Sequence, residues 1–374
     1  MNLVASVPQG FENVLAEEIF ELGAEDIKTY KRSVSFNCNS EVFFKLHFFS
    51  RIAFRFYRVV ACFDCYDRNS LYEGVQKSFD WLKWLPYQKS FCVTSTGGTA
   101  LLRHSHFTAL EVKNSIVDLQ KFAWGKRSSV NISNPFLIVH VHLQNNKATI
   151  SLPSTLKSLH KRGYRPAMGL APLKENIAAG LLKMADWDGT QTLIDIMTGS
   201  GTFLIEGVSQ ALDMPLKLQK DCLFENWKDF DENVFLKEKF KLSKHAIKKP
   251  NFKNIIGCEV NKEVFKQAKE NILIAGMENY IQIYNHDFSK LVINQPKGII
   301  LCNPPYGKKL GNENELVSLY EKIGEFLKKN CSGWDFWLLS GNPSLTKYLK
   351  MKASKKIPIS NGGIDCRWIK YLIR

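Results

Sequence analysis

From about residue 170 onward, short and mostly apolar segments alternate with segments of helical periodicity. The apolar segments are TLIDIM (192–197), NIIGCEV (254–260), YIQIYNHDF (280–288), GIILCNPP (298–305) and DFWLLSGN (335–342). Strands of this kind are buried on both faces, and intervening helices supply the crossovers that parallel strands need. The alternation therefore predicts a doubly wound, mostly parallel sheet. The tail, with strand-like stretches on either side of Asn361-Gly362-Gly363, predicts an added antiparallel hairpin.

The first 155 residues follow a different pattern. Strand-like segments such as NLVASV (2–7) and FRFYRVVACF (54–63) alternate with amphipathic helical ones such as GFENVLAEEIFELGA (10–24) and a basic stretch around 105–120. The segment FLIVHVHLQNNKATISLP (136–153) is typical of two strands joined by a turn at Asn145-Asn146. These local hairpins predict an α+β module in front of the α/β domain.

The basic charge of the chain is concentrated rather than spread. The formal net charge is +15, yet residues 1–102 contain eleven basic and eleven acidic side chains. Residues 103–165 contain ten basic side chains against Glu111 and Asp118, and residues 236–253 contain seven lysines and one glutamate. Such clusters favour a polyanionic partner, nucleic acid in particular, over simple solubility.

Within the first cluster we predict RNA contacts from Arg103, Lys126 and Arg127. The connector HKRGYR adds Lys161, Arg162 and Arg165, which lie in a stretch with little apolar content. Phosphate contact is therefore expected of these three side chains rather than packing. The alternative is that they pack or face solvent.

Each predicted parallel strand ends in a residue suited to ligand binding, because ligands bind at the carboxyl ends of such strands. Asp195 ends the first strand and precedes a turn with two glycines. A helix is expected after this turn, and the backbone amides at its start suit a carboxylate or phosphate. Glu259 can accept two ribose hydroxyls, and Asp287 with Phe288 suits an adenine amine and an adenine face. Together they indicate an adenosine-containing methyl donor. The predicted donor contacts are Asp195, Thr198, Gly199, Ser200, Gly201, Thr202, Glu259, Asp287 and Phe288.

Two rival nucleotide folds fit this loop less well. A dinucleotide-binding GxGxxG loop would need a third glycine where Leu204 stands. A phosphate-binding P-loop would need Gly-Lys-Ser/Thr, which does not follow Gly201.

The fourth strand runs directly into NPPYG at residues 303–307. The amine of a nucleobase is a poor nucleophile, and acceptors aimed at its hydrogens make it a better one. The side-chain oxygen of Asn303 and the backbone carbonyl of Pro304 can supply two acceptors, held rigidly by Pro304 and Pro305. Tyr306 offers a ring on which a base taken out of its helix can stack. The alternative is a proline-rich strand exit beside a capping asparagine.

We expect neither a metal site nor a membrane segment. Cys62 and Cys65 form one CxxC, but no second pair follows at zinc spacing, so two reduced thiols are expected. No apolar run approaches the roughly 18 residues that span a bilayer. The N-terminus has no basic residue before its short apolar stretch, so we predict no signal peptide and a cytoplasmic protein.

The order of DIMTGSGT, GCEVN, HDF and NPPYG resembles that of class I S-adenosylmethionine-dependent amino-methyltransferases. The front half, with RHSHFTALEVKNSIVD and SLHKRGYR followed by APLKENIAAGLL, resembles a ferredoxin-like plus THUMP module. Together they resemble the bacterial THUMP-containing guanine methyltransferases of ribosomal RNA, over nearly the whole chain. NPPY also occurs in DNA adenine methylases, so the pairing with the front module is the specific part.

This resemblance implies a Rossmann-like class I methyltransferase domain at residues 156–374, preceded by a ferredoxin-like segment (1–45) and a THUMP domain (46–155). The last domain would begin with a basic linker (156–172). The sequence departs from compact nucleotide folds in one respect, because the spacing between Asp195 and Glu259 is wide. A lysine-rich insertion at about 213–253 explains this spacing.

The implied activity is methylation of the exocyclic amine, N2, of a guanine in structured RNA, with S-adenosylmethionine as donor. The favoured substrate is 23S ribosomal RNA. The alternatives are a tRNA guanine-N2 methyltransferase, a DNA adenine-N6 methylase, and a catalytically inactive RNA-binding protein.

Overall fold

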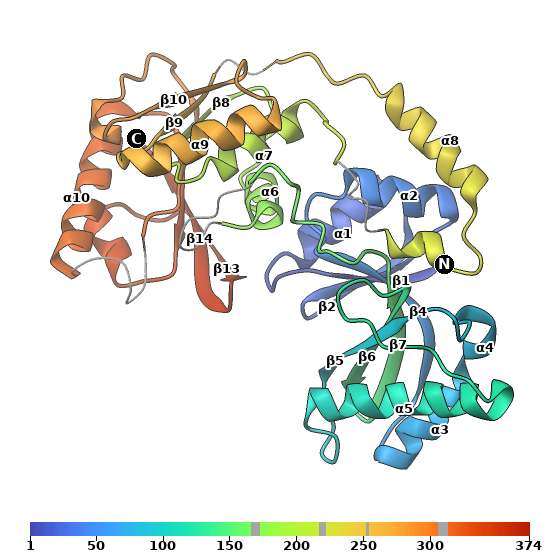
Figure 1. The fold of residues 1–374 in the computed structure, drawn as a ribbon. Coiled ribbons are helices and arrows are strands. Elements are labelled where there is room, and N and C mark those ends of the chain that lie inside the picture. The colour runs from blue at the N-terminus through green and yellow to red at the C-terminus, as the bar shows by residue number, and fades with distance from the viewer. Residues whose placement is uncertain (166–172, 217–221, 252–253, 306–312) are drawn as a thin grey trace.

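The computed structural model describes residues 1–165, 173–216, 222–251, 254–305 and 313–374, which form two seven-stranded sheets (Figure 1). The first sheet has the order β2-β3-β1-β4-β7-β6-β5. Its strands are β1 (Asn2–Ser6), β2 (Glu25–Tyr30), β3 (Ser33–Asn37), β4 (Arg55–Asp64), β5 (Phe91–Gly97), β6 (Leu137–Gln144) and β7 (Lys147–Pro153). Its helices are α1 (Glu12–Glu21), α2 (Ser40–Phe49), α3 (Arg68–Ser78), α4 (Trp81–Trp84) and α5 (Ser105–Trp124).

Strand β4 joins the two halves of this front sheet. It pairs with β1 on one side and with β7 on the other, so the two halves share one continuous sheet. The predicted boundary at residue 45 falls inside α2. Asn145 and Asn146 both have positive φ, at 50° and 56°, and make the predicted turn between β6 and β7.

Strand β2 is an element that the sequence patterns above do not indicate. It lies at the edge of the sheet, and most of its side chains are exposed. An exposed edge strand does not need the alternation of apolar and polar residues that reveals a half-buried strand.

The second sheet has the order β10-β9-β8-β11-β12-β14-β13. Its strands are β8 (Thr192–Asp195), β9 (Ile255–Cys258), β10 (Ile281–Tyr284), β11 (Gly298–Cys302), β12 (Asp335–Ser340), β13 (Lys355–Asn361) and β14 (Ile364–Leu372). The first five in this order are parallel, and β14 runs antiparallel to both of its neighbours. The predicted mostly parallel sheet and its C-terminal hairpin are therefore confirmed.

Helices cover both faces of this second sheet. They are α6 (Glu175–Met184), α7 (Thr202–Ala211), α9 (Lys262–Ala275) and α10 (Glu313–Asn330). Successive strand residues enter separate cores. Leu193 packs with residues of α6 and α7, whereas Ile194 packs with residues of α10. Burial of both faces is why these strands are apolar along their length.

The front module and the second domain are packed directly against each other. Gly180 of α6 lies on the ring of Phe11, where a Cβ would come within 2.5 Å of a ring carbon. The amide of Ser360 in β13 donates to the carbonyl of Gln9 at 2.9 Å. Lys183 of α6 pairs with Glu21 of α1 at 2.8 Å. These contacts fix the position of the second domain relative to the first sheet.

The predicted insertion reaches back over the front module. It contains a 3₁₀ turn, η1 (Leu223–Asn226), and α8 (Glu232–Ser243), which Figure 1 shows beside α2. The rings of Phe235 and Phe44 lie 5.0 Å apart, those of Phe224 and Phe43 5.4 Å. Aromatic packing therefore holds this segment on the front module.

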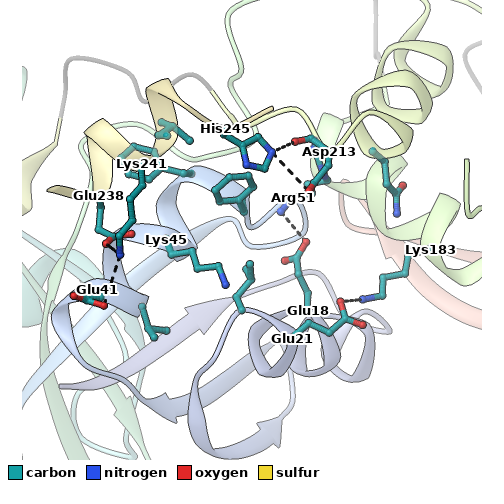
Figure 2. Close-up of a pocket in the computed structure, with 16 residues that line it drawn as sticks. Glu18, Glu21, Glu41, Lys45, Arg51, Lys183, Asp213, Glu238, Lys241 and His245 are labelled. Carbon is teal, nitrogen blue, oxygen red and sulfur yellow. Dashed lines mark hydrogen bonds and ion pairs between the residues drawn. The ribbon is translucent and has the colours of Figure 1, made fainter. Parts of the chain in front are cut away.

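A pocket of about 660 Å³ lies where α1, α2, α7 and α8 meet (Figure 2). Its acidic and basic side chains largely pair with one another: Lys183 with Glu21, and Lys241 with both Glu238 and Glu41. Such internal neutralisation leaves little net charge to attract a ligand. None of the described residues that line the pocket comes from the carboxyl end of a parallel strand, so we interpret it as a gap between packed elements of the fold. No helix in the described ranges is long and apolar enough to cross a bilayer.

Candidate active site

The centre of the site is the point where the strand order reverses, between β8 and β11. The chain runs from β8 outward to β9 and β10 and then returns to β11 on the other side of β8. Asp195 is the last residue of β8 and pairs with Leu301 of β11, two residues before Asn303. In open parallel sheets this reversal opens the crevice in which ligands bind.

Asp195 is buried, with 1% of its surface exposed. Its Oδ1 accepts the Met197 amide at 3.2 Å. Burial raises the pKa of Asp195 to about 7, and the nearby Glu259 carboxylate adds to the rise. A carboxyl group that ionises near neutral pH responds to the charge of whatever binds beside it.

The loop after Asp195 is held by contacts within the domain. Gly199 and Gly201 have φ of +55° and +84°, and α7 begins directly after Gly201. A Cβ on Gly199 would meet nothing within 4 Å, so the backbone there is open to a ligand. Thr198 is buried, and its hydroxyl donates to the carbonyl of Asp195 at 3.0 Å. Gly257 of β9 leaves room for Thr198, because a Cβ there would lie 2.4 Å from the threonine Oγ1.

Glu259 follows β9 and faces the same loop. Its Oε2 accepts the Gly199 amide at 3.0 Å, and its Oε1 accepts the Asn261 amide at 2.8 Å. A carboxylate can accept about four hydrogen bonds. Glu259 therefore keeps acceptor capacity for the two ribose hydroxyls predicted for it, while it also shapes the glycine loop.

Asp287 lies three residues beyond β10, but both of its oxygens already have partners. Oδ1 accepts from the Ser289 amide and hydroxyl, and Oδ2 pairs with Lys322 at 2.7 Å. Burial raises the pKa of Asp287, but the bonds from Lys322 and Ser289 outweigh it and the net shift is downward. An adenine amine would share this carboxylate with Lys322.

The prediction that Phe288 offers its ring as an adenine face is wrong. The side chain is 3% exposed, and its ring packs edge-on against Phe326 with 5.4 Å between centroids. An aromatic residue after a strand end can serve the core as readily as a ligand, and here α10 covers it.

Asn303, Pro304 and Pro305 follow β11 at the centre of the sheet. Asn303 is partly buried, and its Oδ1 has no hydrogen-bond partner in the part of the chain that is described. A buried acceptor without a partner is costly unless a ligand or water satisfies it. Tyr306, predicted to stack on a base, lies outside the described residues.

The phosphate contacts predicted for Arg162 and Arg165 are contradicted by the structure. Arg162 has a side chain 7% exposed, lies 3.0 Å from Glu206 of α7, and donates to the carbonyl of Arg51 at 2.6 Å. Arg165 makes a two-pronged pair with Glu175 at 2.6 and 3.1 Å, both side chains being about 5% exposed. The connector has few apolar residues, yet these two arginines are buried, because each forms an ion pair with a buried glutamate of another segment.

Arg165 also contacts the glycine loop after Asp195, residues 196–202, which we call the donor loop. Its Nη1 donates to the carbonyl of Leu173 at 2.9 Å and to the Thr202 hydroxyl at 3.3 Å. Thr202 starts α7, and its hydroxyl lies 3.2 Å from that of Ser200. Arg165 therefore stabilises the N-terminus of α7 through the Thr202 hydroxyl.

The other predicted RNA contacts lie on the surface. Arg103, Lys126, Arg127 and Lys161 are exposed, and the ammonium of Lys126 sits 5.2 Å from the Tyr87 ring. Their role in RNA binding stays a prediction. Cys62 is exposed and Cys65 buried, and within the described ranges no three His, Cys, Asp or Glu side chains form a group that could hold a metal ion.

Sequence patterns missed one residue that shapes the site. Asn271 is 1% exposed on the buried side of α9, and its side-chain amide donates to the carbonyl of Ser200 at 3.0 Å. The available signal was a polar residue on the otherwise apolar face of an amphipathic helix, beside Ala268 and Ile272.

The second domain has a class I methyltransferase fold and follows an α+β module. Three features define this fold: the strand order of the second sheet, the glycine loop after β8, and the Asn-Pro-Pro sequence after β11. Three family models match successive parts of the chain. The RlmL ferredoxin-like domain matches residues 2–57, and the THUMP domain matches residues 65–153. The methyltransferase domain described as RMKL-like matches residues 162–370, more than half of the chain. The chain belongs to this methyltransferase family.

Known proteins resemble the chain over its whole length. A candidate RNA methyltransferase of Synechocystis sp. is 36% identical over 98% of this chain and 95% of its own. The ribosomal RNA large subunit methyltransferase K/L of Vibrio parahaemolyticus is 34% identical over 99% of this chain and 53% of its own, so the chain spans about half of that relative. The crystal structure of a candidate methyltransferase complexed with SAH superposes with a TM-score of 0.89 at 25% identity, covering 100% of this chain and 98% of that one.

Proposed function

We propose that the chain transfers a methyl group from S-adenosylmethionine to the exocyclic amine, N2, of a guanine in structured RNA, with 23S ribosomal RNA as the favoured substrate. The observation that carries this proposal is the buried Oδ1 of Asn303, at the reversal of the strand order, which has no hydrogen-bond partner among the described residues. A hydrogen-bond acceptor in that place fits an amine that must become more nucleophilic.

The donor fits the residues around Asp195. The open backbone at Gly199, the start of α7 and the spare acceptor sites of Glu259 suit a ligand with a carboxylate and ribose hydroxyls. When bound, S-adenosylmethionine supplies a methyl group on a positively charged sulfur. The Glu259 carboxylate makes the site negative, and Asp195 adds to this when it ionises, which a positive charge beside it favours.

On the acceptor side, Asn303 Oδ1 and the carbonyl of Pro304 accept from the target amine and orient its lone pair toward the donor. Pro304 and Pro305 restrict the backbone that holds these two acceptors. Tyr306 stacks on the extruded base. Exposed Arg103, Lys126 and Arg127 on the front module contact RNA phosphates, and the protein acts in the cytoplasm, where ribosomal RNA is made.

Similarity supports RNA over DNA. The THUMP match favours RNA as the substrate, and the similarity to about half of a ribosomal RNA methyltransferase favours ribosomal RNA. A tRNA guanine-N2 activity uses the same chemistry and is the second candidate. A DNA adenine-N6 methylase or an inactive binding protein would explain the strand-end residues only in part.

Nucleoside mass spectrometry of 23S rRNA, tRNA and DNA, from cells with and without the gene, tests the substrate. We expect N2-methylguanosine to be lost from one site in 23S rRNA. Loss from tRNA alone would identify the second candidate, and loss of a methylated adenine in DNA would refute the proposal.

Asn303→Ala tests the chemistry. Single-turnover methylation with labelled donor should slow by about a hundredfold or more, while donor affinity measured by calorimetry stays nearly unchanged. Asn342→Ala is the matched control, because Asn342 follows the neighbouring strand β12 and accepts from the Ser344 amide at 3.1 Å. A normal single-turnover rate for Asn303→Ala would mean that this asparagine only ends the strand.

A further inference from the structure

The insertion presents a second surface whose composition the methyl-transfer site does not explain. We call it the outer α8 patch, and it consists of Leu236, Lys239, Phe240, Lys244 and Ile247. Leu236 is 52% exposed, Phe240 59% and Ile247 51%. The opposite side of the helix is buried through Phe235 and Glu238. Two large apolar side chains, those of Leu236 and Phe240, are thus left in solvent on a helix that already has a buried face, and Ile247 adds a third beyond the end of the helix at Ser243.

The lysines of this segment divide into two groups. Those on the inner side are paired: Lys237 with Glu41 at 2.9 Å, and Lys241 with Glu238 at 2.5 Å. Lys239 and Lys244 have no ion pair to the described parts of the chain, and each ammonium lies near an aromatic ring: Lys244 near the exposed Phe240, and Lys239 at the margin of the buried face, near Phe235. Lys244 is 4.2 Å from the centroid of Phe240, and Lys239 is 5.2 Å from that of Phe235.

We propose that the outer α8 patch binds RNA, with Lys239 and Lys244 on phosphates and the Phe240 ring against an unpaired base. Two lysines without ion pairs, one of them beside the exposed Phe240 ring, supply the two terms of sequence-tolerant RNA binding, phosphate attraction and stacking. A protein partner would have to bury these lysines, which protein interfaces disfavour. The inference rests on the proposed function, because it takes RNA as the substrate class.

The position of the patch determines which RNA can reach it. Helix α8 is fastened to α2 through Phe235 and Lys237, and Figure 1 shows it away from α9 and α10 of the methyltransferase domain. An RNA that touches both the patch and Asn303 must extend well beyond the target nucleotide. The patch therefore favours a large folded RNA over a short target hairpin.

Filter binding of the full chain to a protein-free 23S rRNA transcript, from 50 to 300 mM KCl, tests this. Lys239→Gln/Lys244→Gln should reduce the slope of log K against log[salt] by roughly 1.4–1.8, since each lost phosphate contact removes about 0.7–0.9. Phe240→Ala should weaken binding by about five- to a hundredfold, the scale of one stacked base. Neither change should affect a hairpin of about 20 nucleotides, the size expected to occupy only the active site.

Lys237→Gln/Lys241→Gln is the matched control on the same helix, because it removes the same charge from the inner side. A slope drop in the outer pair but not in the inner pair supports the patch. An unchanged slope in the outer pair, at a wild-type melting temperature, overturns it. So does Phe240→Ala that changes only the oligomeric state in light scattering, which would assign the face to a protein contact. If the unchanged chain does not methylate guanine but the patch variants still show the slope effect, the proposed function is refuted and the patch stands.

Discussion

The variant Arg165→Gln distinguishes two roles for this connector residue: a buried ion pair that stabilises the fold, and a contact to an RNA phosphate. Arg165 holds Glu175 with one hydrogen bond from Nε and a second ion-pair contact from Nη2, and both side chains are almost fully buried. Glutamine can replace neither the charge nor the forked geometry of the guanidinium. The Glu175 carboxylate would then be left buried without its counter-charge, and the bond to the Thr202 hydroxyl would be lost as well.

The size of the effect follows from the burial of the pair. Removing one partner of a buried ion pair costs about 3–5 kcal/mol in the free energy of unfolding. For a domain of 150–250 residues each kcal/mol shifts the melting temperature by roughly 2–4 °C, so we expect a drop of roughly 6–20 °C. A phosphate-binding arginine would instead leave stability unchanged and reduce the salt slope of RNA binding by about 0.9.

Thermal unfolding by circular dichroism and salt-dependent filter binding read out the two roles on the same protein. Lys161→Gln, an exposed charge in the same connector, is the control and should not lower the melting temperature. Arg165→Met/Glu175→Leu should recover much of the lost stability, because apolar replacement of both partners leaves no buried charge. Arg165→Gln with a wild-type melting temperature and a reduced salt slope would refute the assignment.

Two further predictions concern the donor loop. Because the pKa of Asp195 is about 7 when folded and near 3.9 when unfolded, the donor-free folded state binds the extra proton between these values, so stability should fall by up to about 1.4 kcal/mol per pH unit as pH rises from about 4 to 7. Asp195→Asn should flatten this part of the melting profile, and parallel profiles would show that Asp195 does not ionise there. Gly257→Ala places a Cβ 2.4 Å from Thr198 Oγ1 and 2.5 Å from Leu204 Cδ1, which should cost about 1–3 kcal/mol of stability and weaken donor binding in calorimetry. Unchanged donor affinity in that variant would mean that the loop adapts without loss.

The sequence by itself determined the α/β domain and the places where its site residues stand. Apolar strands and amphipathic helices have local periodicities, and parallel strands bring their carboxyl ends to one edge. The positions of Asp195, Glu259 and Asn303 at that edge follow from these two facts, without knowledge of any long-range contact. The hairpin around Gly362 and the turn at Asn145-Asn146 were predictable for a similar reason, because their backbone requirements lie within a few residues.

Only the tertiary structure decided what the charged and aromatic residues outside the strands contact. Arg162 meets the carbonyl of Arg51, 111 residues earlier, and Phe235 meets Phe44 across almost 200 residues. The sequence around an arginine looks the same whether its guanidinium binds a phosphate or forms a buried ion pair. Its partner is chosen by the packing of distant segments, so no local pattern could distinguish Arg165, which supports the donor loop, from Lys161, which stays at the surface.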